Sequence, residues 1–389
     1  NGLEKRPKLR FPGFDEPWSI YKAEELFKNV ADKNHPMETV LTIIQGKGTL
    51  PREQAGRNIH YDDASLANYK KVEQGDFIIH LRSFEGGLEM ANEDGIVSPA
   101  YTILRCMKPH SSLFYEAYFH TDEFINHILS KSVEGIRDGR QISYEAFKWL
   151  GLPYCDLSEQ ERIAQLFCTL SHRIEKQQQM VDALKKYKRG LFNQIFSAIS
   201  KSSQCRKLRE LVRVSGGKTP SMSNSLYWNG DIVWISSKDM KSSRISGSEL
   251  KITNLALNEM TLYHPGTLLL VARSGILKHS LPLAILEVDA TINQDIKALQ
   301  VHGCNAFYLY YAILSQEDTI IRTLVKTGTT VQSLMMDSFL NIEIPTPDID
   351  QQQRIIDKLA KLEKYVEVQE KELSLLSQMR NGLLQQLFI

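Results

Sequence analysis

Two stretches of the chain carry the same hydrophobic pattern. Along residues 163–195 and again along 355–387, apolar side chains recur in alternating steps of four and three. This spacing averages 3.5 residues and draws a narrow apolar stripe along a long helix that packs against another helix. The expected seam positions are Ile163, Phe167, Leu170, Ile174, Gln177, Val181 and Leu184 in the first stretch, and Ile355, Leu359, Leu362, Val366, Gln369, Leu373 and Leu376 in the second. Each stretch therefore predicts one half of a coiled coil.

The two stretches belong to an internal repeat. Residues 153–196 align with 345–388 without a gap, at an offset of 192 residues. Each copy opens on a proline, which cannot continue a strand ladder or sit inside a helix, and Ser158 and Asp350 are the expected helix caps. At about 1.5 Å of rise per residue, a helix over 159–196 extends roughly 55 Å, more than one turn of DNA.

Two polar or small residue types recur within the repeat. Gln177 and Gln369 fall on the seam, where a polar residue can fix the register of pairing; an exposed glutamine at a splayed seam remains the alternative. Gly190 and Gly382 sit late in each helix, where glycine costs about 1 kcal/mol relative to alanine. Fraying near a helix end would tolerate one glycine, but its recurrence predicts close approach by a crossing or partner helix.

The residues between the helices form two blocks of similar size, roughly 20–152 and 206–344. In each, a glycine turn leads into a short apolar strand that ends on Arg-Ser, at Arg82-Ser83 and Arg273-Ser274. Aromatic-rich helical stretches over 113–131 and 307–324 are expected to be core. Basic glycine turns follow over 137–140 and 326–330, and their exposed donors suit phosphate oxygens.

Composition narrows the class of protein. With 389 residues, 42% of them hydrophobic, the chain can bury the cores of two or three domains. No apolar run reaches membrane-spanning length and the first ten residues are charged, so we expect a cytoplasmic protein that does not contact membranes. The net charge is only +1, but residues 201–244 carry nine Lys and Arg against three acids. The five cysteines form no CxxC pair, which argues against a zinc site or a disulfide framework.

Motifs for catalysis are missing from the sequence. Gly217-Lys218-Thr219 suggests a phosphate-binding loop, but that motif needs a glycine where Val212 stands. The tetrapeptide 98–101 is similar to that of amino-methyltransferases, but it lacks the second proline and an upstream glycine-rich loop. The sequence therefore predicts a binding protein with no catalytic residues, no metal and no cofactor of its own.

The repeat and its flanking motifs resemble the specificity subunit of type I restriction-modification systems. The resemblance covers nearly the whole chain and rests on the doubled helix with its Gly-Leu-x-x-Gln-x-Phe ending, the early segment 9–14, and the segments 216–221 and 228–236. It implies an α+β fold in which two α/β target recognition domains are joined by two long antiparallel coiled-coil helices, with a pseudo-two-fold internal repeat. The expected boundaries are 1–152 for the first recognition domain, 153–200 for the first helix, 201–344 for the second recognition domain and 345–389 for the second helix.

The resemblance also implies a function. Each recognition domain would bind one half of an asymmetric bipartite site on double-stranded DNA, and the helices would set the spacer and dock two modification subunits. Those subunits would supply S-adenosylmethionine and methylate adenine, and a restriction subunit would add ATP- and Mg-dependent cleavage. The chain itself would be a non-catalytic subunit of the adenine methyltransferase and endonuclease complex.

Candidate DNA contacts are basic or hydroxyl side chains on expected loops. Arginine can hydrogen-bond guanine with two donors, whereas lysine contacts are more often positional. The candidates are Arg52, Arg57, Arg82, Ser83 and Arg140 for the first half-site, and Lys218, Thr219, Ser221, Lys238, Arg273, Lys278 and Lys326 for the second. Two alternatives are a coiled-coil scaffold whose blocks bind other ligands, and a self-sufficient DNA-modifying enzyme. The basic segment 201–244 argues against the first, and the missing motifs argue against the second.

Overall fold

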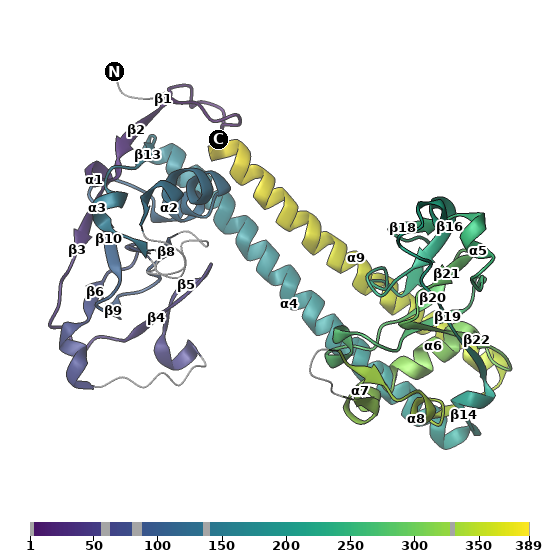
Figure 1. The fold of residues 1–389 in the computed structure, drawn as a ribbon. Helices are drawn as coiled ribbons and strands as arrows, with labels where there is room; N and C mark the ends of the chain where they lie inside the picture. The colour runs from purple at the N-terminus through teal and green to yellow at the C-terminus, as the bar shows by residue number, and fades with distance from the viewer. Residues whose placement is uncertain (1–3, 56–62, 80–87, 135–140, 327–330, 389) are drawn as a thin grey trace. The chain divides into compact units, whose positions relative to one another are not determined.

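The computed structural model describes residues 4–55, 63–79, 88–134, 141–326 and 331–388 (Figure 1). The chain divides into two compact units. Unit 1 comprises residues 1–178 and 371–389, and unit 2 comprises residues 179–370. Two long helices, α4 (Leu157–Ser202) and α9 (Ile349–Phe388), each contribute one end to each unit.

Unit 1 is built on small antiparallel sheets. Its main sheets have the strand orders β3-β10-β7-β8 and β1-β2-β13, and the pairs β4-β5, β6-β9 and β11-β12 complete it. Its elements before α4 are β1 (Glu4–Lys5), β2 (Trp18–Lys22), α1 (Ala23–Leu26), β3 (Phe27–Val30), β4 (Leu41–Ile44), β5 (Gly48–Pro51), β6 (Lys70–Val72), β7 (Phe77–Ile79), β8 (Glu89–Met90), β9 (Gly95–Val97), β10 (Thr102–Cys106), α2 (Ser112–Phe119), β11 (Val133–Glu134), β12 (Gln141–Ile142), α3 (Tyr144–Phe147) and β13 (Gly151–Tyr154).

Unit 2 has a larger, mixed sheet. Its order is β15-β22-β19-β20-β17, beside a second sheet β18-β16-β21 and the pairs β14-β25 and β23-β24. Its elements between the long helices are β14 (Cys205–Lys207), β15 (Val212–Gly216), β16 (Trp228–Ile235), β17 (Arg244–Ile245), β18 (Leu250–Ile252), α5 (Asn254–Leu257), β19 (Leu268–Val271), β20 (Leu283–Leu286), β21 (Ala290–Ile292), β22 (Ile296–Val301), α6 (Ala306–Leu314), α7 (Glu317–Leu324), β23 (Val325–Lys326), β24 (Ser333–Leu334), α8 (Met336–Phe339) and β25 (Glu343–Pro345).

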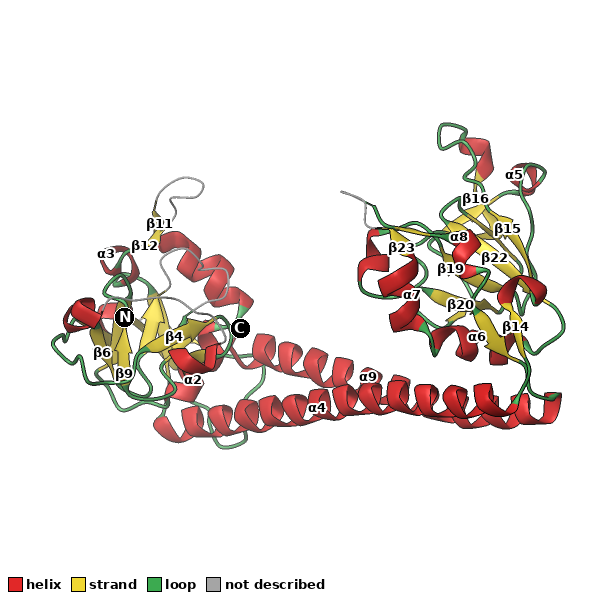
Figure 2. Cartoon of the chain, turned by 90° about the horizontal axis from the view of Figure 1, so that it is seen from below, coloured by secondary structure: helices red, strands yellow, loops and turns green. Residues whose placement is uncertain are grey.

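Within each unit, the start of one long helix lies beside the end of the other (Figures 1 and 2). In unit 1, Arg173 pairs with Glu372 at 3.3 Å, and in unit 2, Lys185 pairs with Glu370 at 2.6 Å. The two helices are therefore antiparallel, and the predicted α+β class with two long antiparallel helices is confirmed. All fourteen seam positions are buried or half-buried, including Gln177 and Gln369.

The helix starts differ from the sequence expectation by two residues. Ser158 is not the cap of α4, because the Asp156 carboxylate accepts the backbone N–H of Ser158 at 2.8 Å. Asp348 takes the same role for α9 and accepts the N–H of Gln351 at 2.7 Å, so Asp350 is not the cap either. In both copies the aspartate is the first polar residue that can bond two or three positions ahead, which is the geometry a cap requires.

The close approach expected at the two glycines is not made within the described chain, and approach by a partner helix stays a prediction. A Cβ added at Gly190 or Gly382 would meet no described atom within 4 Å, so neither glycine is needed for close approach of a helix within the described chain. Fraying does not account for Gly190 either, because α4 continues to Ser202.

A buried glutamine anchors the start of each long helix. In unit 1, the Gln160 amide donates to the Cys155 carbonyl at 2.8 Å and accepts the Ser111 N–H, just ahead of α2, at 3.0 Å. In unit 2, Gln352 donates to the Pro347 carbonyl at 2.8 Å and accepts the Asn305 N–H, just ahead of α6, at 2.9 Å. Because both amides are fully bonded, they can be buried at little cost. Gln160 and Gln352 therefore have the same structural role in the two units.

The aromatic helices α2 and α6 pack against the starts of α4 and α9, and we call these two contacts the helix junctions. The Tyr115 hydroxyl donates to the Pro153 carbonyl at 3.1 Å, and the Tyr308 hydroxyl donates to the Pro345 carbonyl at 2.7 Å. Both tyrosines are fully buried, as expected for core. The last residue of α9, Phe388, packs on Trp18, Phe114, Tyr118 and Phe167, which explains the terminal phenylalanine of the second copy.

Unit 1 adds an ion pair that unit 2 lacks. Glu159, 1% exposed, receives two hydrogen bonds from the Arg10 guanidinium at 2.9 and 2.7 Å and a third from the Trp18 indole at 2.9 Å. The hydrogen bond from Arg10 to Glu159 raises the pKa of the guanidinium. The same helical position in unit 2 is Gln351, which is half-buried. The early segment 9–14 is thus a structural anchor for α4.

Candidate nucleic-acid interface

The second candidate half-site gathers at one edge of unit 2. Strands β16 and β21 run parallel, with Ile235 opposite Ile292, so their carboxyl ends open on the same side. The chain after β16 is held to the chain after β21, because the Asn293 N–H donates to the Ile235 carbonyl at 2.9 Å. Four loops meet around this edge, and we call them the unit 2 loop edge: residues 217–221, 236–239, 272–278 and 293–295.

Gly217 lets the first loop cross close to β21. An added Cβ at Gly217 would lie 2.0 Å from the Ile292 carbonyl oxygen, so only glycine fits there. The next residue, Lys218, donates its N–H to the Ile292 carbonyl at 3.0 Å and leaves its side chain exposed. The Thr219 hydroxyl hydrogen-bonds the Gln294 side chain. The Gly-Gly-Lys-Thr segment therefore needs its glycine for packing, which agrees with rejecting a nucleotide-binding loop.

Two tryptophans fix the same loop through hydrogen bonds from their indole N–H groups. The Trp234 indole donates to the Lys218 carbonyl at 3.1 Å, and the Trp228 indole donates to the Ser221 carbonyl at 3.1 Å. Their rings meet edge to face at 5.2 Å between centroids. Because both donors bond backbone carbonyls, the path of the loop is fixed while the side chains of Lys218, Thr219 and Ser221 stay exposed.

Arg273 lies on the loop edge as well. The Ala272 N–H donates to the Asp295 carbonyl at 2.8 Å, and Arg273 itself bridges Ser333. Ser333 in turn pairs with Lys326 across β23 and β24. Arg273 and Lys326 therefore lie on either side of Ser333, and the bond from Ala272 joins this segment to the turn over residues 293–295. Lys278 ends the short helix over 275–278 that follows directly.

Lys238 stands on a turn fixed by an aspartate. The Asp239 carboxylate accepts the Ser236 N–H at 2.8 Å, the Ser236 hydroxyl at 2.7 Å and the Glu249 N–H at 3.0 Å. Burial raises the pKa of Asp239, but these donors outweigh it and the pKa is lowered. Asp239 thus stays ionised as an acceptor, and Lys238 is left exposed on the turn, near the 276–280 segment across a shallow cavity.

The structure therefore brings six candidates to the unit 2 loop edge, with Lys326 beside it across Ser333: Lys218, Thr219, Ser221, Lys238, Arg273 and Lys278. Among the described residues, none of the five cations in this set forms an ion pair. A rigid edge with several uncompensated cations suits contact with phosphate oxygens. The sequence did not single out Gln294, which links two of the loops; only the strand pairing locates it.

Most of the candidate residues for the first half-site lie outside the residues that the structure describes. Arg57, Arg82, Ser83 and Arg140 lie outside the described residues. Arg52 opens a short 3-10 helix over 52–55, where its N–H donates to the Val40 carbonyl at 2.9 Å. Its positive charge opposes the effect of burial, which raises the pKa of Tyr101. Arg52 is therefore half-buried beside Tyr101.

Other features of the described chain bear on the class of protein. Searched over the residues that the structure describes, no group of three or more His, Cys, Asp or Glu could hold a metal ion. In the same residues, every helix is too short or too polar to cross a membrane.

Comparison with known proteins decides the relationship. Residues 200–378, which include the whole unit 2 loop edge, match the family described as the type I restriction modification DNA specificity domain. The chain is a relative of type I specificity subunits. It is 32% identical over 252 residues to the specificity subunit of the type I restriction enzyme EcoR124I/EcoR124II from Escherichia coli, covering 62% of either chain.

A second relative comes from Methanocaldococcus jannaschii. It is the specificity subunit of type I restriction enzyme MjaIX, 30% identical over 197 residues, which are 49% of this chain and 45% of that protein. The chain thus spans less than two thirds of the length of either curated relative.

Solved structures share the fold over nearly the full chain. The crystal structure of a type I restriction-modification S subunit from M. genitalium matches with a TM-score of 0.61 at 15% identity, covering 98% of this chain and 99% of that one. A structure described for complex assembly and conformational transition of a type I system matches with a TM-score of 0.56 at 15% identity, over 98% and 99%. These matches confirm the predicted fold.

Proposed function

We propose that this chain is the DNA-recognition subunit of a type I restriction-modification complex and that it does no chemistry itself. Each unit binds one half of an asymmetric bipartite site, and the unit 2 loop edge contacts the second half. The observation that carries the proposal is this edge: six of the seven candidates for the second half-site gather there, inside the matched specificity domain. A base-reading surface needs such rigid, exposed donors.

The proposal assigns the long helices two roles. They set the number of unread base pairs between the half-sites, and they dock two modification subunits, one for each copy of the repeat. The antiparallel pairing inside each unit and the equivalent glutamine anchors support this assignment, since two like junctions offer two like docking surfaces. DNA has local two-fold symmetry, with neighbouring major-groove segments about 34–36 Å apart, which suits two similar domains.

The reaction belongs to the partners in this proposal. The modification subunit binds S-adenosylmethionine and methylates adenine, and a restriction subunit, where one exists, uses ATP and Mg. The competing function, a coiled-coil scaffold with other ligands, gains no specific support from the described residues.

Methylome sequencing tests the proposal. DNA from cells that express this chain with its cognate modification subunit is compared with DNA from cells that express the modification subunit alone. We expect one split, asymmetric methyladenine motif only in the first sample. A confirmed complex that yields no new motif would contradict the proposal.

Arg273→Ala sharpens the assignment of the loop edge once the motif is known. Loss of a base contact weakens binding by about 1–3 kcal/mol at one position of the second half-site, whereas loss of a phosphate contact weakens specific and random DNA equally. Lys251→Ala, an exposed lysine on β18 outside the loop edge, is the matched control and should leave both affinities unchanged. Binding is measured by fluorescence anisotropy at several salt concentrations.

A further inference from the structure

The helix junctions of the two units differ in one respect: unit 1 is hollow where unit 2 is filled. In unit 2, the Glu363 carboxylate on α9, 13% exposed, lies 3.3 Å from the Lys188 ammonium on α4. It also accepts hydrogen bonds from the hydroxyls of Tyr310 at 3.3 Å and Tyr311 at 3.1 Å, both on α6. A cation, a carboxylate and two phenols therefore close this junction.

The internal repeat identifies the matching positions in unit 1. At the offset of 192 residues, Lys188 corresponds to Arg380 and Glu363 corresponds to Ser171. The tyrosines that bond the opening prolines, Tyr115 and Tyr308, align the aromatic helices, so Ala117 takes the place of Tyr310. Unit 1 thus keeps the cation but replaces the carboxylate and one phenol by two small side chains.

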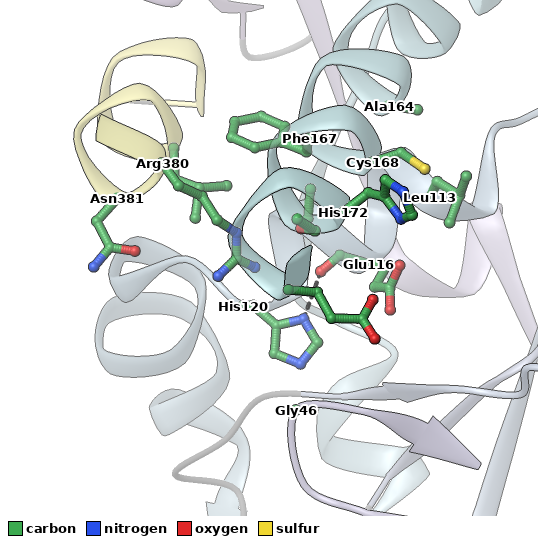
Figure 3. Close-up of a pocket in the computed structure, with 14 residues that line it drawn as sticks. Gly46, Leu113, Glu116, His120, Ala164, Phe167, Cys168, His172, Arg380 and Asn381 are labelled. Atoms are coloured by element: carbon green, nitrogen blue, oxygen red, sulfur yellow. Dashed lines mark hydrogen bonds between the residues drawn. The ribbon is translucent and has the colours of Figure 1, made fainter. Parts of the chain in front are cut away.

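The result is a cavity of about 520 Å³ between α2, α4 and α9 of unit 1 (Figure 3). Ala117, Ser171 and Arg380 all line it, together with Phe167, Leu113 and Leu384. This volume is within the range of small-ligand pockets, which is about 300–1,000 Å³. The apolar part of its wall is what an aromatic ring would contact.

Two cationic groups in the cavity have hydrogen-bonding capacity to spare. The Arg380 Nε atom is buried and forms no hydrogen bond with any described residue, and the same holds for the His120 Nε2 atom. Figure 3 shows Arg380 reaching from α9 towards His120. The His120 Nδ1 donates to the Glu116 carbonyl at 2.8 Å, which leaves Nε2 as the free end, 3.8 Å from a Glu89 oxygen. A buried donor without a partner costs about 1–3 kcal/mol, so an acceptor placed there is favoured.

No acidic group among the described residues forms a hydrogen bond with either nitrogen, although Glu89 lies within ion-pair distance of His120. Glu89 is bonded to the N–H groups of Gly46 and Gly48 at 2.7 and 3.0 Å. Burial raises the pKa of Glu116, although the charges of His120 and Arg380 oppose this shift. Glu175 and His172 lie at the open side of the cavity, where both are exposed.

We propose that this cavity is a binding site for a small organic acid with an aromatic ring. The ring takes the space that Tyr310 fills in unit 2, and the carboxylate takes the place of Glu363, bonded by Arg380 and His120. Unit 2 thereby shows within the same chain what the occupied arrangement looks like. The site is independent of DNA recognition by the loop edge.

Titration with 4-hydroxyphenylacetate, which carries both a phenol ring and a carboxylate, tests the proposal. Binding to the full chain is followed by ligand-observed NMR and calorimetry. For a ligand of this size we expect a dissociation constant on the order of 0.1–1 mM. Two matched probes, 4-methylphenol without the carboxylate and tyramine with an amine instead, should bind at least about tenfold more weakly.

Three variants locate the binding. Ala117→Tyr with Ser171→Glu rebuilds the closed arrangement of unit 2 and should abolish binding while raising the Tm of the free chain. Ser171→Glu alone should also compete with the ligand, which keeps the test valid if the double variant does not fold. Arg380→Gln should weaken binding about tenfold or more, because a charge-assisted hydrogen bond is lost.

Lys188→Gln, the same change at the matching position of unit 2, is the control and should leave binding unchanged. Two results would overturn the proposal: no binding of 4-hydroxyphenylacetate up to roughly 10 mM, well above the expected range, or equal binding by the native chain and a folded Ala117→Tyr, Ser171→Glu variant.

Discussion

Units 1 and 2 use the same helix junction but stabilise it with different charged groups. Both keep a buried glutamine and a buried tyrosine hydroxyl bonded to a proline carbonyl. Unit 1 has a buried carboxylate at the start of α4, where Glu159 meets Arg10. Unit 2 has a half-buried carboxylate about three turns beyond the matching position of α9, where Glu363 meets Lys188. Duplicated elements thus preserve the groups that satisfy backbone atoms and let the ion pairs diverge.

The largest effect should come from the ion pair that is special to unit 1. Glu159→Ala leaves the Arg10 guanidinium and the Trp18 indole without their acceptor, and removing one partner of a buried pair costs about 3–5 kcal/mol. Gln351→Ala, the matching change in unit 2, should cost under about 1 kcal/mol because that side chain is half-buried and its N–H remains capped. Urea denaturation of the full chain gives both values. Equal losses would show that the two helix starts do not differ.

The shared glutamines should instead give equal effects. Gln160→Ala and Gln352→Ala each remove two hydrogen bonds and leave a backbone N–H without its acceptor. Each should lower the free energy of unfolding by about 2–3 kcal/mol. Exposed Gln353→Ala serves as the control. A loss confined to one of the two would break the equivalence of the junctions.

A pH dependence of stability that arises from His120 should be found in unit 1 alone. Burial lowers the pKa of His120, but the Glu89 carboxylate and the Glu116 carbonyl outweigh it, and the pKa is raised above its ordinary value. The charged histidine therefore contributes stability that is fully present below the unfolded-state pKa of about 6.5 and is lost as pH rises through the folded-state pKa.

His120→Gln should remove this loss of stability as pH rises above about 6.5. Unit 2 has Ile313 at the corresponding position, so unit 2 should show no such change. Thermal unfolding of the native chain and the variant is measured at a series of pH values. Hydrogen exchange at the same pH values shows which unit changes in stability. An unaltered pH profile in the variant would assign the effect to another group.

The smallest effect should come from the helix glycines. Gly190→Ala and Gly382→Ala meet open space within the described chain, so each should stabilise the free chain by about 0.5–1 kcal/mol. Denaturation of the free chain and pull-down of the modification subunit are measured together. If a variant is more stable but captures less modification subunit, the glycines serve docking of that subunit. A variant that destabilises the free chain would contradict the open space found around both glycines.

The sequence predicted what depends on periodicity and failed where tertiary contacts decide. The 3.5-residue spacing predicted the long helices, and the resemblance to type I specificity subunits implied their antiparallel pairing. The caps at Asp156 and Asp348 were missed by two residues, because several polar residues precede each helix and only the bonded geometry selects one. The roles of Glu159 and Gln160 were also missed, since nothing in their spacing shows that Arg10 and Ser111, distant in sequence, lie beside them.

The candidate interface was likewise predicted in part. Arg273 follows an apolar strand, as the sequence indicated, but its proximity to Lys326 depends on the bridge to Ser333. The role of the two tryptophans that hold the Lys218 loop was not predicted, because it depends on the backbone carbonyls that their indole N–H groups bond in the fold. Sequence alone thus yields the chemistry of the loops, and the fold decides which loops meet.

A domain exchange tests the central claim most directly. Residues 206–344 are replaced by the corresponding segment of another specificity subunit with a known motif, and the methylome is sequenced with the cognate modification subunit. We expect one half of the split motif to change while the other half and the spacer length stay the same. A change in both halves, or in neither, would contradict the account that each unit recognises its own half-site.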